Sequence, residues 1–172
     1  MKNIQLIYII SIFIALGCGE KETFYNLAKE DKPIYEINDT LIYRSILDNY
    51  DTLIVVEKIN AYEIHDKKYH YEYITIKFKN LDNSSAPCSL EIKLNYLSLS
   101  WYSVYYSSNN LNNLLSQSVT INDITYDNVN ELTEFTDYHN EYDEITKIYY
   151  NNRYCVLKYI FSNGEIFELI QY

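Results

Sequence analysis

The sequence predicts an all-β protein: an antiparallel sandwich or a curled, barrel-like sheet of about 8–10 strands with a C-terminal β-meander. Three observations support this class. Tyrosine is strongly over-represented, with 21 copies in 172 residues, beside only three glycines and two prolines. Tyrosine and β-branched residues suit a pleated, half-buried surface. Several segments alternate apolar and polar residues with period two, and tight-turn dipeptides separate them.

The first 17 residues have the pattern of an export signal. Lys2 gives a positive start, and an apolar run without charge follows over 13 residues, 4–16. A transmembrane helix needs about 20 residues to cross the hydrocarbon core, so this run is too short to span it. A short apolar run before small residues is typical of a cleaved signal peptide.

The stretch Ala15-Leu16-Gly17-Cys18 resembles a bacterial lipobox, although the residue types at its first two positions are swapped relative to the usual pattern. In that motif small residues admit the signal peptidase, and the cysteine thiol carries the diacylglycerol. The resemblance implies a palmitate-bearing lipoprotein that Cys18 anchors to the outer membrane, facing the periplasm or the cell surface. Two or three acyl chains anchor stably where one is marginal.

The remaining chain divides into a tether and one domain. Residues 18–38 are polar and charged, as expected for a lipidated tether. Residues 39–172 are enough for a single β domain with a sizeable core. Its first expected strands are 40–45, 51–59 and 69–79, of which the last alternates most regularly.

A change of phase marks the segment 88–108. Leu90 and Ile92 share one face, whereas Leu97 and Leu99 share the opposite face. One straight strand of this length would extend about 70 Å. We therefore expect a bulge or break near Asn95-Tyr96.

Turn dipeptides predict the remaining pairings. Asn122-Asp123 divides residues 118–129 into a hairpin, because both residues tolerate positive φ. Asn151-Asn152 is expected to form the first of the two tight turns in the three-stranded C-terminal meander.

The last hairpin of the meander turns at Asn163-Gly164, the strongest short hairpin signal in the chain. A two-residue type I′ turn there pairs Leu157 with Ile170 in the core and leaves Lys158 in solvent.

Charge and missing motifs exclude several functions. The net charge is −10, and loss of residues 1–17 leaves 13 basic and 24 acidic residues. Such a chain repels nucleic acid backbones, so we expect no nucleic acid partner. After residue 17 only Gly19 and Gly164 remain, which excludes glycine-rich phosphate loops and the G-x-S-x-G elbow. We expect no cofactor, no catalytic residue and no enzymatic activity.

His65 and His70 are the weak candidates for a metal site. If Lys67-Lys68 forms a two-residue turn, the two imidazoles face each other across a hairpin. With a third ligand they could hold zinc or copper. The plainer interpretation is a solvated hairpin end.

Four aromatic residues are candidates for ligand stacking, namely Trp101, Tyr102, Tyr105 and Tyr106. They could form a platform for sugar rings. The alternative, which strand periodicity favours, packs either Trp101 with Tyr105 or Tyr102 with Tyr106 in the core and leaves the other pair half exposed.

Cys88 and Cys155 both lie on apolar strand faces. Export to an oxidising compartment allows a disulfide between them if their strands are adjacent. Two buried thiols are the other interpretation.

The segments TLIYRS…DTLIVVEK, VTINDITYDNV and KIYYNNRYCVLKY…GEIFELI resemble a family of small Bacteroidetes-type lipoproteins of uncharacterised function. The likeness covers most of residues 40–172 and lies in the order of strands and turns. Cys155 stands where those proteins often carry glycine. The resemblance implies an all-β domain on a lipid anchor and brings no catalytic residues.

Two functions fit these observations. The first is an outer-membrane-anchored lipoprotein whose non-catalytic β domain binds an envelope partner or a glycan. The alternative is a carrier of an apolar ligand or lipid, held in a curled half-barrel sheet.

Overall fold

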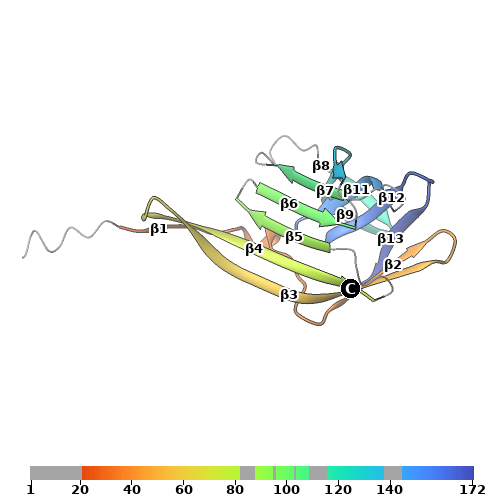
Figure 1. The fold of residues 1–172 in the computed structure, drawn as a ribbon, viewed down its shortest axis with the longest axis horizontal. Coiled ribbons are helices and arrows are strands. Elements are labelled where there is room, and N and C mark those ends of the chain that lie inside the picture. The colour runs from red at the N-terminus through yellow and green to blue at the C-terminus, as the bar shows by residue number, and fades with distance from the viewer. Residues whose placement is uncertain (1–20, 82–87, 95, 103, 109–115, 138–144) are drawn as a thin grey trace, which may run out of the picture.

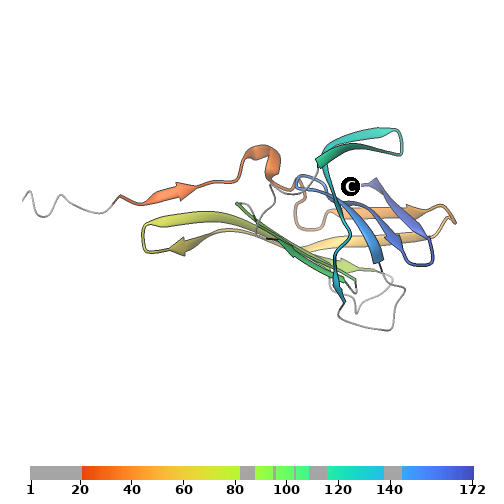
Figure 2. The same ribbon diagram turned by 90° about the horizontal axis from the view of Figure 1, so that it is seen from above.

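The computed structural model describes residues 21–81, 88–94, 96–102, 104–108, 116–137 and 145–172. Within them one sheet of thirteen strands curls into a half-barrel, so the predicted all-β class is confirmed in its curled form (Figures 1 and 2). None of these residues forms a helix long and apolar enough to span a membrane.

The strands outnumber the expected 8–10 because the segment 88–108 yields three and the N-terminal segment adds one. They are β1 (Thr23–Tyr25), β2 (Thr40–Ser45), β3 (Tyr50–His65), β4 (Tyr69–Asn80), β5 (Cys88–Lys93), β6 (Tyr96–Trp101), β7 (Val104–Ser108), β8 (Ser116–Ile121), β9 (Ile124–Leu132), β10 (Thr136–Asp137), β11 (Ile145–Asn151), β12 (Cys155–Phe161) and β13 (Ile166–Gln171). A short 3₁₀ turn, η1 (Lys29–Asp31), lies between β1 and β2.

The strand order explains the curl. It runs β10-β7-β6-β5-β4-β3-β2-β13-β12-β11-β9-β8, with β1 added in parallel to β4. Residues 133–135 alone link β9, near one end of this order, to β10 at the other end. Four residue steps reach at most about 14 Å, so the two ends of the sheet must approach each other.

Aromatic side chains fill the concave side of the sheet. The Trp101 ring on β6 lies 5.9 Å from the Tyr43 ring on β2 and 6.2 Å from the Tyr159 ring on β12, measured between ring centroids. All three residues are buried. Because their strands belong to opposite halves of the sheet, this ring cluster joins the two halves in one core.

The expected break in 88–108 and one expected turn are confirmed. Lys93 pairs with Tyr96, so the chain reverses its direction between β5 and β6. Asn122 and Asp123 link β8 to β9 with φ angles of 47° and 65°. Their tolerance of left-handed backbone makes this tight turn accessible.

The register expected for the last hairpin is wrong by one residue. Gly164 has a φ of 86°, as expected, but Tyr159 pairs with Phe167. The Gly164 amide donates to the Phe161 carbonyl at 3.0 Å, and the Phe161 amide donates to the Glu165 carbonyl at 2.9 Å. This is a three-residue loop closed by a glycine bulge, instead of the two-residue type I′ turn.

The shift moves the final strand to its other face. Ile170, expected in the core, is exposed, and Leu169 is buried instead. Lys158, expected in solvent, forms an ion pair with Glu168 at 2.9 Å. A one-residue slip has this effect because side chains alternate between the faces of a strand.

The expected tether of residues 18–38 is folded in its described part. β1 adds to the edge of β4, and Leu27, Pro33 and Tyr35 are buried. The Tyr35 hydroxyl donates to the Tyr154 carbonyl at 2.9 Å. The folded unit therefore begins upstream of residue 39, the boundary that the sequence predicts.

Candidate functional site

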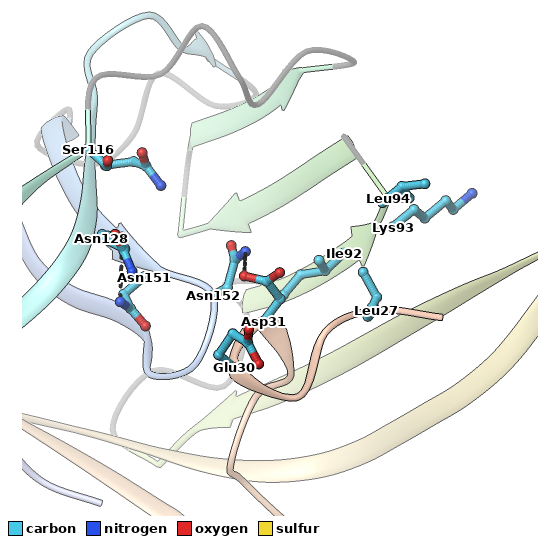
Figure 3. A pocket seen from close by; sticks show the side chains of 11 residues that line it. Leu27, Glu30, Asp31, Ile92, Lys93, Leu94, Ser116, Asn128, Asn151 and Asn152 are labelled. Atoms are coloured by element: carbon cyan, nitrogen blue, oxygen red, sulfur yellow. Dashed lines mark hydrogen bonds between the residues drawn. The ribbon is translucent and has the colours of Figure 1, made fainter. Parts of the chain in front are cut away.

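A polar cleft of about 260 Å³ lies between the N-terminal segment and strands β5, β8, β9 and β11 (Figure 3). Its walls come from η1, from the end of β5, and from β8, β9 and the β11–β12 turn. Four asparagines line it: Asn128, Asn130, Asn151 and Asn152. The volume is near the lower end of the roughly 300–1,000 Å³ typical of small-molecule sites.

The side chain of Asn151 links β9 to the β11–β12 turn in one wall of the cleft. Its Nδ2 donates to the Asp127 carbonyl at 2.6 Å, and its Oδ1 accepts from the backbone amides of Arg153 and Tyr154 at 2.8 and 3.1 Å. The buried Asn151 amide therefore shapes the turn instead of facing a ligand.

Asn152 ties the turn to the N-terminal segment. Its Nδ2 donates to Asp31 Oδ1 at 3.1 Å, and its Oδ1 accepts from the Tyr150 hydroxyl at 2.5 Å. Figure 3 shows the Asn152–Asp31 bond across the cleft. A primary amide carries two donor hydrogens, and among the described residues the second hydrogen of Asn152 has no acceptor.

Asn128 and Asn130 are the best placed to meet a ligand. Within the part of the chain that the structure describes, neither side chain has a hydrogen bond, and Asn128 is exposed. Asn128 has a φ of 55°, a left-handed conformation that asparagine tolerates. With Ser116 and Glu30 beside them, they bring several donors and acceptors to one cleft.

The charge of the cleft is negative on balance. Its charged lining residues are Glu30, Asp31 and Lys93, and the Lys93 ammonium points away from the two carboxylates (Figure 3). Lys93 is itself bound to Glu63 at 2.8 Å and to Glu91 at 3.2 Å. Burial would lower the pKa of Lys93, but the hydrogen bonds that Lys93 donates to these two carboxylates outweigh it and raise that pKa. The cleft therefore disfavours anionic ligands.

Glu72 fixes the N-terminal segment beside the cleft. This buried carboxylate accepts from the Leu27 amide at 2.8 Å and from Lys32 Nζ at 2.5 Å. Burial would raise the pKa of Glu72, but the hydrogen bonds from Lys32, Leu27 and Asn60 together lower it. Leu27 and Ile92 then add an apolar floor to the cleft.

The aromatic candidates do not form a stacking platform. Trp101 is fully buried, so no ligand reaches its ring. Tyr102 and Tyr106 pack against the core, whereas Tyr105 lies on the other face, opposite Ser100. Trp101 and Tyr105 were expected on one face of a strand, but the chain turns at Tyr102, where φ is 53°, and the alternation is interrupted there.

His65 and His70 do not face each other. His65 pairs with Tyr69 and Ile64 pairs with His70, so the two imidazoles lie on opposite faces of the hairpin. The His70 ring stacks on the Phe24 ring at 4.4 Å between centroids. No group of three or more metal-ligating side chains occurs among the residues that the structure covers.

Cys88 and Cys155 are both free, buried thiols. They lie on β5 and β12, which four other strands separate in the sheet order, so they lack the adjacency that a disulfide needs. Burial raises the pKa of the Cys88 thiol to about 12 and also raises that of Cys155. Cys18, the candidate lipidation site, lies outside the described residues.

Sequence reasoning did not identify the cleft asparagines. Asn151-Asn152 has the pattern of a turn alone, and the hairpin signal at Asn122-Asp123 predicts the pairing of β9 with β8 but not its pairing with β11. Their sole signal is an unusual density of asparagine in strands, where this residue is normally depleted.

The chain was compared with known proteins. No protein-family model matches it, and neither a curated protein nor a solved structure shows significant similarity to it.

Proposed function

We propose that this protein is a lipid-anchored, non-catalytic binding protein of the outer membrane, whose β domain takes an uncharged glycan into the asparagine-lined cleft. The observation that carries the proposal is the pair Asn128 and Asn130, whose side-chain amides line the cleft without an internal partner in the described chain. In this proposal the glycan is the envelope component that the β domain recognises.

The cleft chemistry fits a neutral, hydroxyl-rich ligand. Amides and the Ser116 hydroxyl can both donate and accept, as the hydroxyl groups of a sugar require. The excess of carboxylates over Lys93 disfavours phosphate and other anions. The apolar floor of Leu27 and Ile92 can cover the C–H face of a sugar ring.

The alternative of a lipid carrier requires an apolar cavity inside the curled sheet. Tyr43, Trp101 and Tyr159 instead fill the described concave side with packed rings. This packing supports binding at the polar cleft over carriage of an apolar ligand.

The anchor and the location rest on the first residues of the chain. The apolar run, the small residues and Cys18 support export and lipidation. The lack of an aspartate directly after Cys18 supports the outer membrane over retention at the inner one. Exposure to the periplasm or to the cell surface is compatible with this placement.

A glycan array tests the proposed binding. Protein purified with its anchor in detergent should bind one or more uncharged oligosaccharides on an array that also carries anionic ones. The double substitution Asn128→Ala and Asn130→Ala should abolish this signal, because it removes both free amides.

Asn49→Ala provides the matched control. This exposed asparagine donates to Glu165 at the β2–β3 turn, away from the cleft. Its substitution should leave glycan binding unchanged. Binding restricted to anionic glycans, no binding at all, or full binding by the double variant would contradict the proposal.

A further inference from the structure

The hairpin of β3 and β4 extends beyond the rest of the sheet as an arm (Figure 1). β3 has 16 residues, which span about 50 Å. Its distal half, with β4 and β1, presents exposed Phe24, Tyr25, Tyr62, Ile64 and Tyr69. Exposed apolar side chains gathered in this way mark a contact surface.

The chain leaves the fold at the tip of this arm. β1 runs parallel to β4, with Thr23 opposite Tyr69, the first residue of β4. The Thr23 amide donates to the carbonyl of Lys68, in the hairpin turn itself, at 2.7 Å. Everything upstream of Thr23 therefore starts beside the turn.

The distance to the anchor is short. Only five residue steps separate Thr23 from Cys18. Even fully extended, they reach at most about 18 Å. A lipid on Cys18 therefore holds the tip of the arm close to the bilayer surface.

The side chains at the tip suit that surface. Tyrosine is enriched where proteins meet the membrane–water interface, since its ring is apolar and its hydroxyl polar. The exposed tyrosines Tyr25, Tyr62 and Tyr69 therefore suit that level of the bilayer.

We propose that the tip of the β3–β4 arm, with β1, lies on the bilayer and inserts Ile64 and its neighbouring aromatic rings at the headgroup level. This inference rests on the proposed lipidation of Cys18. It assigns the arm a role as a spacer, because the β2–β3 turn lies at the far end of β3 from the membrane.

Fluorescence quenching by brominated lipids tests the contact. Ile64 is 63% exposed, so Ile64→Trp places a fluorophore at the tip. The full-length lipidated protein would be reconstituted into vesicles of phosphatidylethanolamine and phosphatidylglycerol containing phosphatidylcholine brominated near its headgroup. Trp101, the sole tryptophan of the chain, is buried and gives the background to subtract. The fluorescence added by Ile64→Trp should be largely lost.

The β2–β3 turn supplies a matched control. Ile46 is 78% exposed beside exposed Leu47, so this turn is as apolar as the tip but lies at the opposite end of β3. Ile46→Trp should keep its fluorescence in the same vesicles.

Flotation of the vesicles separates the two proposals. Protein that floats while Ile64→Trp stays unquenched would overturn the membrane contact and leave the lipid anchor in place. Equal quenching of both variants would also overturn it, because the contact would not be specific to the tip. Protein that does not float would refute the anchor, and the inference would fall with it.

Discussion

At the scale of single residues, the most consequential group is the buried carboxylate of Asp51. It accepts hydrogen bonds from the hydroxyls of Tyr102 and Tyr159 and from Asn80 Nδ2, the last at 2.7 Å. Burial raises the pKa of Tyr159 well above its usual value, with further contributions from Tyr102 and Asp51. The hydroxyl therefore stays protonated and keeps donating.

Tyr159→Phe should lower the free energy of unfolding by about 1–3 kcal/mol, because it leaves a buried acceptor short of a donor. Urea unfolding of the purified protein measures this change. Tyr50→Phe removes a hydroxyl from an exposed ring and should change the free energy by less than about 0.5 kcal/mol. Equal effects of the two substitutions would mean that the Asp51 cluster does not stabilise the core.

Part of this residue-level picture was available from the sequence. Asp51 alternates in phase with Leu53 and Val55, which predicts that it points inward. Its donors could not be foreseen, because Tyr102 and Tyr159 reach it only once distant strands curl together. The left-handed backbone of Cys155, with φ of 55°, is uncommon for a residue with a Cβ atom and has no short sequence signal.

At the scale of strands, the turn after β12 decides which side chains are buried. Leu169→Ala should cost about 2–5 kcal/mol, because it opens a cavity at a buried position. Ile170→Ala should cost clearly less, since Ile170 is 42% exposed. Urea unfolding of both variants compares them directly. A larger loss of stability from Ile170→Ala than from Leu169→Ala would contradict the observed register and support the two-residue turn instead.

The fixation of the N-terminal segment to β4 should depend on pH. The folded pKa of Glu72 is lowered from its ordinary 4.5, so its contribution is present above that value and is lost as the pH falls through the folded pKa. Glu72→Gln should lower the free energy of unfolding at neutral pH by about 1–3 kcal/mol. The difference from the unsubstituted protein should shrink below about pH 4.5.

Hydrogen exchange at the Leu27 amide reports this contact directly, because that amide donates to Glu72. Exchange should accelerate in Glu72→Gln. Glu131→Gln is the control: Glu131 pairs with Lys147 at 2.6 Å and stays half exposed, and the Leu27 amide donates to Glu72 instead of to Glu131. Equal acceleration in both variants would contradict a specific role of Glu72.

Strand positions were predictable where alternation is regular, as in 69–79, and less so where it is interrupted. A bulge between Val55 and Glu57 reverses the phase of β3, so the second half of that strand could not be assigned to a face. The turn at Tyr102 was missed for a related reason: its left-handed backbone is uncommon for tyrosine and has no short sequence signal.

At the scale of the whole molecule, local patterns define the class but not the site. Alternation and turn dipeptides were sufficient to predict an all-β, antiparallel fold, but they left a sandwich and a curled sheet as alternatives. The cleft depends on contacts between segments far apart in the chain, such as Asp31 with Asn152 and Leu27 with Glu72. Those contacts form only when the N-terminal segment folds back on the sheet. The polar composition of this segment is typical of a tether, so the sequence does not predict that it folds.

The same N-terminal segment connects the fold to its proposed anchor, and Cys18 is the residue on which that connection depends. Cys18→Ser should abolish acylation and leave the precursor uncleaved, because serine lacks the thiol that receives the diacylglycerol. Metabolic labelling with a fatty acid, followed by the intact mass, measures both effects. Cys88→Ser is the control: that thiol is buried and its pKa is raised to about 12, so it is no acceptor, and labelling should persist. Label that remains on Cys18→Ser would show that the lipid is attached to another residue. The argument that places the arm beside the bilayer would then fail.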